Sequence, residues 1–406
     1  MAAYDQLETR SADERAASVA ECLPALVAHA KTLPGYADAF AQVAAGDVTD
    51  ADALAKLPVL RKSALGKAQA ARRPFGGFTS IGVQGFTHAF QSPGPLYEPG
   101  RDVRDWWRLG RFVHGAGIND HDLVQNCFSS HLTPAGMMFD NAARAVGAAV
   151  LPAGTGQTEL QARAAHDLGV TAYAGTPDYL KVILEAADAA GLDLGISKAV
   201  VSGGALFPSL RAAYAERNIE CLQCYATADL GLIAYESSAM EGMIVDEGVI
   251  VEIVTPGTGN PVPEGEVGEV LVTVLNHDYP LIRFATGDLS AVMPGGSPCG
   301  RTNMRIKGWM GRADQTTKIK GMFVRPEQVA DLVAKHDEVS KIRVLAKRDG
   351  EMDRMVVQIE TSLCEPDRYA ASIKEVLKLS GDVQLVDPGS LPKDGKVIDD
   401  QRQYDT

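Results

Sequence analysis

The sequence predicts an α/β protein with a large N-terminal α/β domain and a small, mobile C-terminal α+β domain. The chain has 406 residues, more than a single hydrophobic core usually supports. Strand and helix signals alternate through residues 123–224, which is typical of parallel sheets with crossover helices. Short strands separated by Pro and Gly turns follow, so we expect a small β-barrel-like part appended to the parallel sheet.

The first elements are helical. Ala, Leu and charged residues recur at helical spacing through residues 11–45, and a short connector at 57–62 precedes a further helix. The alternating region then predicts strands at 123–128, 148–152, 170–174, 198–201 and 219–224, with helices at 134–146, 158–168, 177–190 and 208–217. Glycines at 154–156 and 203–204 fall on loops beyond strand ends, where α/β sheets bind ligands.

The second half has shorter elements. Strands are expected at 249–254, 268–275 and 289–293. The C-terminal signals are a hairpin at 316–319 and 322–324, helices at 326–335 and 366–379, and strands at 339–347, 355–360 and 383–386. We expect an N-terminal domain at 1–312 and a C-terminal domain at 313–406.

Composition excludes several function classes. The net charge of −13 disfavours nucleic acid as a partner, because an acidic protein repels a phosphate backbone. No run of about 18 apolar residues occurs, so no membrane span is expected. The first thirty residues mix charged and apolar side chains, unlike a signal peptide. We expect a cytoplasmic protein.

One motif combines a carboxylate with an arginine. The apolar run 279–285 leads into Thr286-Gly287-Asp288, which we expect to form a tight turn that exposes the carboxylate. About two dozen residues later, a second glycine turn presents Arg312. A carboxylate and a guanidinium on neighbouring turns suit a ribose diol. The two ribose hydroxyls can donate hydrogen bonds to the carboxylate and accept them from the guanidinium.

The order of these pieces, with a late lysine at Lys396, resembles the adenylate-forming (AMP-binding) enzyme superfamily and, within it, the phenylacetate–CoA ligase family. The resemblance runs from about residue 20 to the end. It implies an AMP-forming acid–CoA ligase, which activates a carboxylic acid with ATP and Mg²⁺ to an acyl-adenylate and then forms a thioester with coenzyme A. It also suggests an aryl or arylacetic acid and a homodimer.

The resemblance assigns the nucleotide site to residues in three segments. Tyr225 would stack beside adenine, Thr227 would contact the α-phosphate, and Asp229 would hold Mg²⁺, where most relatives have Glu. Asp288 would bind both ribose hydroxyls, and Arg312 would make a second ribose or phosphate contact.

Two further turns match the family. Ser202, Gly203 and Gly204 correspond to the turn that closes over adenine, since glycine allows a backbone to approach a flat ring. Tyr173 and Gly175 would line the acid pocket. An equally good alternative for these two is a core aromatic residue and the start of a helix.

The C-terminal assignments concern chemistry and motion. Lys396 would bridge the substrate carboxylate and the α-phosphate, with Lys393 as a competitor three residues away. Asp314 falls at the family's domain hinge. Gly321 would flank the tunnel for coenzyme A.

Residues 90–100 depart from the family pattern. Relatives have a Ser/Thr/Gly-rich loop that cradles the β- and γ-phosphates, and here only Ser92 and Gly94 remain of it. Pro93 and Pro95 have no backbone N–H groups to donate. Glu98 falls near the position where a positive charge would favour phosphate binding. Two rival functions therefore stay open: an adenylating enzyme with an amine or carrier-protein acceptor, and a non-catalytic nucleotide- or acyl-CoA-binding protein.

The six cysteines give little support for a metal. Cys221 and Cys224 form the one CxxC pair, and Cys299 would be a remnant of the zinc ligands that some relatives carry. A zinc site needs four suitable ligands, and residues 240–248 contain neither Cys nor His. We therefore favour buried, reduced thiols over zinc.

Overall fold

A nine-stranded sheet has the strand order β14-β15-β10-β9-β8-β7-β6-β4-β5. The computed structural model describes residues 3–313, 317–320, 322–349 and 352–402. These described residues fall into two units, the first within 3–251, 272–284 and 293–308, and the second comprising those within 252–271, 285–292 and 309–402.

The parallel part of the sheet confirms the predicted alternation of strands and helices. Strands β4 to β8 pair in parallel. The elements are β4 (Leu123–Asn126), α5 (Ala135–Ala145), β5 (Ala149–Leu151), α6 (Thr158–Leu168), β6 (Ala172–Gly175), α7 (Pro177–Ala189), β7 (Lys198–Val201), α8 (Pro208–Glu216) and β8 (Glu220–Thr227).

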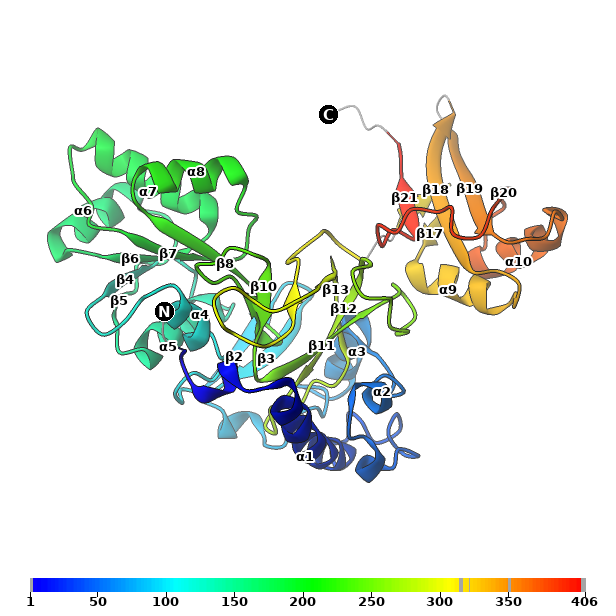
Figure 1. Cartoon of the computed structure of the whole chain (residues 1–406), viewed down its shortest axis with the longest axis horizontal. Coiled ribbons are helices and arrows are strands. Elements are labelled where there is room, and N and C mark those ends of the chain that lie inside the picture. The colour runs from blue at the N-terminus through cyan, green and yellow to red at the C-terminus, as the bar shows by residue number, and fades with distance from the viewer. Residues whose placement is uncertain (1–2, 314–316, 321, 350–351, 403–406) are drawn as a thin grey trace. The chain divides into compact units, whose positions relative to one another are not determined.

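Helices cover both faces of these strands. Figure 1 shows α7 and α8 on one side of the strands and α5 on the other. The side chains follow the two-residue period of a strand: Ala172 and Ala174 pack in the cluster that includes α5, whereas Tyr173 packs in the cluster that includes α6, α7 and α8. Burial on both faces explains why these strands are rich in apolar residues.

The remaining strands of this sheet are short. They are β9 (Gly231–Tyr235), β10 (Met243–Val245), β14 (Val292–Met293) and β15 (Arg305–Ile306). Pairing of β8 with β9, of β9 with β10 and of β10 with β15 is antiparallel. Sequence analysis did not predict β9, β10 or β15.

The N-terminal region differs from the single long helix suggested for 11–45. Helix α1 (Ala12–Lys31) begins at a capping box of Ser11 and Glu14 and ends before Pro34-Gly35, where the helical spacing continues only as turns. The elements that follow are α2 (Ala51–Leu54), β1 (Leu60–Arg61), α3 (Lys62–Ala71), β2 (His88–Ser92), β3 (Leu96–Gly100) and α4 (Gly110–Gly115), with 3₁₀ turns at Gln6–Thr9, Ala45–Asp47 and Val83–Gly85.

A four-stranded sheet, in the order β1-β13-β12-β11, corresponds to the predicted β-rich part. Its later strands are β11 (Val249–Val254), β12 (Gly268–Val274) and β13 (Phe284–Ser290). The tight turn expected at Thr286-Gly287-Asp288 is wrong, because these residues lie within β13. Gly287 has a φ of +74°, so the strand bends locally without ending.

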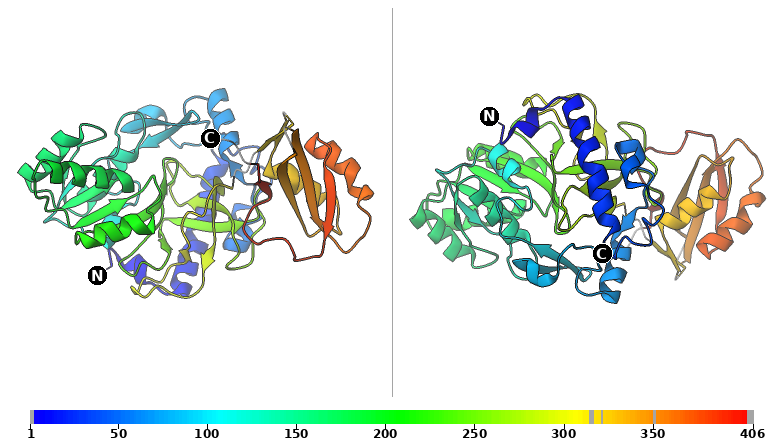
Figure 2. Two further views of the ribbon diagram at one scale, coloured as in Figure 1. Left: turned by 90° about the horizontal axis from the view of Figure 1, so that it is seen from above. Right: turned by 90° about the horizontal axis from the view of Figure 1, so that it is seen from below.

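The C-terminal residues form a sheet with the order β20-β19-β18-β21, covered by two helices. Figure 2 shows this sheet and its helices from two sides. The elements are β16 (Thr317–Ile319), β17 (Met322–Val324), α9 (Pro326–Ala334), β18 (Lys341–Asp349), β19 (Met352–Glu360), α10 (Asp367–Leu377), β20 (Asp382–Val386) and β21 (Ile398–Asp400). This α+β arrangement was predicted, except for β21. Among the described residues, no helix is long and apolar enough to cross a membrane.

Candidate active site

The turn after β7 lies at the C-terminal edge of the parallel strands. Ser202 donates its backbone N–H to Gly175 of β6 over 3.2 Å and its hydroxyl to the Cys224 carbonyl of β8 over 3.1 Å. Gly203 has a φ of +72°, and Gly203 and Gly204 are exposed. The structure thus places the predicted adenine turn on the edge where open α/β sheets bind ligands.

The end of β8 carries three more predicted residues. Tyr225 is buried and lies next to an irregularity in the pairing with β9. Thr227 is the last residue of the strand, and its hydroxyl accepts a hydrogen bond from the Leu230 N–H over 3.2 Å. Asp229 follows in the turn. Thr227 therefore stabilises the turn that presents Asp229.

Tyr173 lies in the apolar core. The ring is fully buried, and the hydroxyl donates to the Thr176 carbonyl over 3.0 Å. A Cβ at Gly175 would lie 2.1 Å from that hydroxyl, so Gly175 is needed to accommodate the tyrosine. This is the core position that the sequence analysis kept as an alternative, and a role in the acid pocket stays a prediction.

The altered phosphate segment is a hairpin of β2 and β3, with Gly94 exposed at its turn. Ser92 donates its hydroxyl to Glu98 Oε1 over 2.5 Å. The Glu98 side chain is turned inward and is only 1% exposed. The one hydroxyl retained from the phosphate-loop pattern is thus engaged by a buried acid.

Asp229 is held by Lys62. The Lys62 ammonium donates to Asp229 Oδ2 over 2.9 Å, and the Asp229 side chain is 1% exposed. Burial raises the pKa of Glu98 to about 8, and the neighbouring Asp229 carboxylate adds to the rise. Burial also raises the pKa of Tyr279 well above its ordinary value, with Asp229 and Glu98 contributing.

Asp288 and Arg312 are adjacent in the second unit. Arg312 Nη1 donates to Asp288 Oδ1 over 2.9 Å, and Trp309 Nε1 donates to the same oxygen over 3.1 Å. The backbone of Gly311 and Ala313 pairs with β13 through hydrogen bonds of 2.9 and 2.8 Å. The predicted carboxylate and guanidinium therefore come together, although on a strand and its neighbour.

Lys396 lies on an exposed loop of the second unit. Its ammonium is 3.4 Å from Asp399 Oδ1, and its backbone N–H donates to Asp394 Oδ1 over 3.1 Å. Lys393 forms an ion pair with Glu266 at 2.5 Å, which raises the pKa of its ammonium. The predicted hinge and tunnel residues, Asp314 and Gly321, lie outside the described residues.

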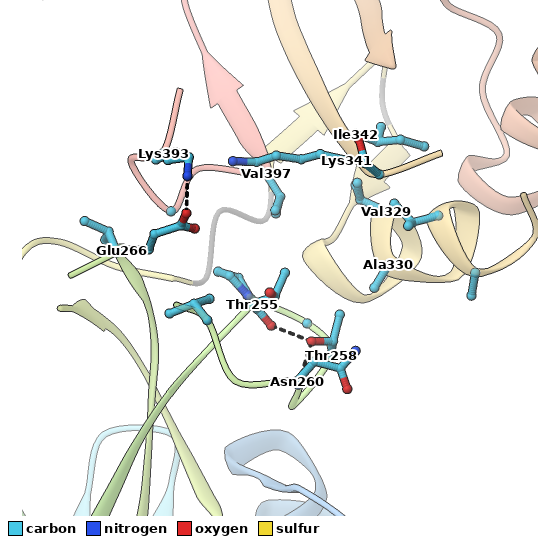
Figure 3. A pocket seen from close by; sticks show the side chains of 18 of the residues that line it. Thr255, Thr258, Asn260, Glu266, Val329, Ala330, Lys341, Ile342, Lys393 and Val397 are labelled. Atoms are coloured by element: carbon cyan, nitrogen blue, oxygen red, sulfur yellow. Dashed lines mark hydrogen bonds and ion pairs between the residues drawn. The ribbon is translucent and has the colours of Figure 1, made fainter. Parts of the chain in front are cut away.

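A cavity of about 620 Å³ lies within the second unit. It is lined by residues of 255–267, 329–342 and 393–397. Figure 3 shows the ion pair of Lys393 and Glu266 at this cavity, together with the hydrogen bond from the Thr258 hydroxyl to the Thr255 carbonyl. Lys396 is not among its lining residues.

Cys299 is the one cysteine with a lowered pKa among the described residues. Burial opposes ionisation of its thiol, but hydrogen bonds with Ser237, Ser297 and Arg301 lower its pKa to about 7. By contrast, burial raises the pKa of Cys221 and Cys224 to about 12. The described residues contain no group of three or more His, Cys, Asp or Glu side chains that could hold a metal ion.

Sequence reasoning missed three residues of the site region. Lys62 pairs with Asp229, the pKa of Tyr279 responds to the charges of Asp229 and Glu98, and Trp309 donates to Asp288. The signal that was available was Glu98, an acid in a segment that binds phosphate in relatives. The position of Glu98 indicated an unusual arrangement of charges, but it did not indicate which residues would take part.

Comparisons with known proteins found a matching family and several similar proteins. Residues 111–274 match the family described as AMP-binding enzyme. A phenylacetate-coenzyme A ligase of Escherichia coli is 27% identical over 429 aligned residues, covering 96% of this chain and 94% of the relative. A phenylacetate-coenzyme A ligase of Thermus thermophilus is 26% identical over 318 aligned residues, which cover 70% of this chain and 72% of the relative.

The fold resembles that of a solved 2-hydroxyisobutyryl-CoA ligase in complex with its acyl-adenylate. The TM-score is 0.71 at 23% identity, with 95% of this chain and 89% of the other covered. The match thus extends over nearly the whole chain in both sequence and fold. The chain is thus similar over nearly its whole length to phenylacetate-coenzyme A ligases, and residues 111–274 match the AMP-binding enzyme family.

Proposed function

We propose that this chain is an AMP-forming acid–CoA ligase that activates a carboxylic acid with ATP and transfers the acyl group to coenzyme A. The observation that carries the proposal is the similarity to a curated phenylacetate-coenzyme A ligase over 96% of this chain and 94% of the relative. A likeness of that extent concerns the whole protein and not one nucleotide-binding segment.

In the first half-reaction, an oxygen of the acid attacks the α-phosphorus of ATP. The bond from this phosphorus to the oxygen that bridges the β-phosphorus breaks, and pyrophosphate leaves. Asp288 would accept hydrogen bonds from both ribose hydroxyls, while Arg312 would make the second ribose or phosphate contact. Lys396 would bridge the two reacting groups and offset the charge that develops on phosphorus.

Mg²⁺ fits the residues around Asp229. Asp229 Oδ1 is buried and has no hydrogen-bond partner among the described residues, so a ligand at that oxygen would satisfy it. Carboxylate oxygen is the ligand type that Mg²⁺ prefers. Bound there, the ion would neutralise phosphate charge, and Lys62 would share the carboxylate.

In the second half-reaction, the thiolate of coenzyme A attacks the acyl carbon and AMP leaves. We propose that a C-terminal domain beginning at residue 313 moves about Asp314 between the two steps, and that Gly321 flanks the path of the thiol. An aryl or arylacetic acid is the substrate class that the family suggests. A homodimer and a cytoplasmic location stay predictions.

Acid-dependent exchange of labelled pyrophosphate into ATP tests the first half-reaction alone. We expect exchange with at least one member of a panel of aryl, arylacetic and aliphatic acids, followed by thioester formation when coenzyme A is added. Exchange without thioester formation would favour an amine or a carrier-protein thiol as the acceptor.

The hairpin of residues 88–100 favours a second candidate, a non-catalytic nucleotide- or acyl-CoA-binding protein. Pro93 and Pro95 offer no N–H groups, and the Ser92 hydroxyl is bound to Glu98. A protein that binds AMP but exchanges no pyrophosphate with any acid would have this second function.

A further inference from the structure

Arg343 of β18 contacts the loop of residues 391–397, which carries Lys396 and leads directly into β21. Strand β18 pairs in parallel with β21, so the arginine and this loop lie in the same part of the second unit. The Arg343 side chain is only 7% exposed. A guanidinium this buried needs partners for its charge and its N–H groups. Arg343 finds them in two carboxylates, one on each side of Lys396.

The two carboxylates belong to Asp394 and Asp399. Arg343 Nη1 donates to both oxygens of Asp394, over 2.8 and 3.0 Å, and Arg343 Nη2 forms an ion pair with Asp399 Oδ2 at 3.1 Å. Asp394 Oδ1 in turn accepts a hydrogen bond from the backbone N–H of Lys396 over 3.1 Å. One buried guanidinium therefore holds the chain just before Lys396 and just after it.

Arg343 also competes with Lys396 for Asp399. The Lys396 ammonium is 3.4 Å from Asp399 Oδ1, whereas Arg343 and the side-chain amide of Gln401 contact Oδ2 of the same carboxylate at 3.1 and 2.8 Å. The positive charge of Arg343 weakens the attraction of this carboxylate for the ammonium. Without Arg343, Asp399 would draw the Lys396 ammonium towards itself and away from a ligand.

Other contacts hold the first part of the loop. The Leu391 N–H donates to Glu360 Oε1 over 2.7 Å, and the Lys341 ammonium donates to the carbonyl of the residue after Leu391 over 2.8 Å. Neither contact involves Arg343. Replacing this arginine should therefore release the segment around Lys396 and leave the start of the loop attached.

We propose that Arg343 is a positioning residue for the first half-reaction: through Asp394 and Asp399 it fixes the backbone around Lys396 and keeps the ammonium available to the reacting groups. The catalytic consequence rests on the proposed function, whereas the anchoring of the loop does not. A guanidinium suits this task, because its planar fork can bond two carboxylates at once, whereas an ammonium is a point charge.

Pyrophosphate exchange, with the acid that the wild type exchanges fastest, measures the catalytic consequence. Arg343→Gln should lower the maximal rate about ten-fold or more, because a displaced ammonium offsets less of the charge that develops on phosphorus. The ATP concentration for half-maximal exchange should stay within about two-fold of the wild type. Thioester formation from supplied acyl-AMP should be spared. Arg343→Lys should recover part of the rate, since it keeps the charge but not the fork.

The matched control is Arg354→Gln, which removes an exposed ion pair with Asp382 from the same sheet and should exchange like the wild type. Asp394→Ala removes the other half of the Arg343 contact and should reproduce the pattern of Arg343→Gln. Its side chain is 39% exposed, so this variant is expected to fold even if Arg343→Gln does not. Thermal melting of each variant checks folding.

A double substitution separates positioning from a general structural effect. If Arg343 acts through Lys396, adding Arg343→Gln to Lys396→Ala should cause no further loss of pyrophosphate exchange, because no ammonium is left to position. A merely structural role would lower the rate again by the same factor.

Hydrogen–deuterium exchange, followed by mass spectrometry, tests the anchor without turnover. Arg343→Gln and Asp394→Ala should both exchange faster in the peptide that covers residues 394–399, where the Lys396 N–H loses its fixed acceptor. The peptide that covers α10 should exchange as in the wild type, because it does not depend on this contact.

Four results would overturn the proposal: unchanged deuterium exchange of 394–399 in Arg343→Gln, an unchanged rate of pyrophosphate exchange in that variant of an active enzyme, equal loss in both half-reactions, or a full further loss in the double variant. A wild type that exchanges no pyrophosphate with any acid, while Arg343→Gln loosens 394–399, would refute the ligase activity and retain the anchor.

Discussion

Arg312 donates from Nη1 to Asp288 Oδ1 over 2.9 Å, and the two residues face each other across an antiparallel bridge. The Asp288 side chain is 10% exposed, whereas that of Arg312 is 55% exposed. The carboxylate is thus largely buried within the fold, while the guanidinium that pairs with it reaches solvent. This asymmetry is suited to a ribose, whose two hydroxyls need a carboxylate in a defined orientation.

Asp288→Ala should weaken binding of AMP and ATP severely. Two hydrogen bonds from ribose hydroxyls to a carboxylate would be lost, together about 3 kcal/mol or roughly a hundred-fold in Kd. Calorimetric titration measures the change directly. Asp382→Ala is a matched control, because Asp382 is an exposed acid that pairs with Arg354 in the same unit. Equal nucleotide affinity in wild type and Asp288→Ala would refute the ribose assignment.

Gly287→Ala should disturb Arg312 in addition to straining the backbone. Gly287 has a φ of +74°, and an added Cβ would lie 2.8 Å from Arg312 Nη2. Gly389 has a similar φ of +82° with no atom within 4 Å of an added Cβ. Both alanine variants should lose about 1–2 kcal/mol of stability from the left-handed backbone.

Only the Gly287 variant should also bind AMP more weakly, because only there does the new methyl group displace the guanidinium. Thermal melting and calorimetry, applied to both variants, separate the two effects. Equal loss of AMP affinity in Gly287→Ala and Gly389→Ala would contradict the role given to Arg312.

The elements that could be predicted from the sequence are those with a clear period. Helix Thr158–Leu168 and strand Lys198–Val201 have the predicted bounds, because each presents a regular apolar pattern between turn residues. Strands β10 and β15 have only three and two residues, too few for a period to be seen. Their pairing depends on distant parts of the chain.

The residues of the candidate site also divide into those that a local pattern could predict and those that it could not. Asp288 and Arg312 could be predicted together, since both belong to local motifs with recognisable spacing. Lys62 pairs with Asp229, which lies 167 positions further along the chain, and no local sequence pattern predicts this pair. Thr286-Gly287-Asp288 was read as a turn because glycine usually marks one, but pairing on both sides keeps it within β13.

Cys299 should react with iodoacetamide at a lower pH than the other thiols. With a pKa lowered from 9.0 to about 7, half of this thiol is ionised near pH 7, and its rate should level off above pH 8. At pH 7 its thiolate fraction is about fifty times that of a thiol titrating at 9. Peptide mass spectrometry across pH 6–10 gives the profile.

Ser297→Ala removes one of the hydrogen bonds to Cys299 and should shift the alkylation profile to higher pH. Cys221 should stay unmodified until the protein unfolds, because it is buried and burial raises its pKa to about 12. A Cys299 profile centred near pH 9 in the wild type would mean that these hydrogen bonds do not stabilise the thiolate.

Lys396→Ala should lower the rate of acyl-adenylate formation by about 10²–10³, while thioester formation from supplied acyl-AMP is spared. The reason is that Lys396 offsets charge only when the acid attacks phosphorus. Among the described residues its ammonium makes a long contact, to Asp399 at 3.4 Å, so it is available to a ligand. Lys393→Ala is the matched control, since Lys393 is paired with Glu266. Equal loss in both half-reactions, or a larger first-step loss in Lys393→Ala, would assign the catalytic charge elsewhere.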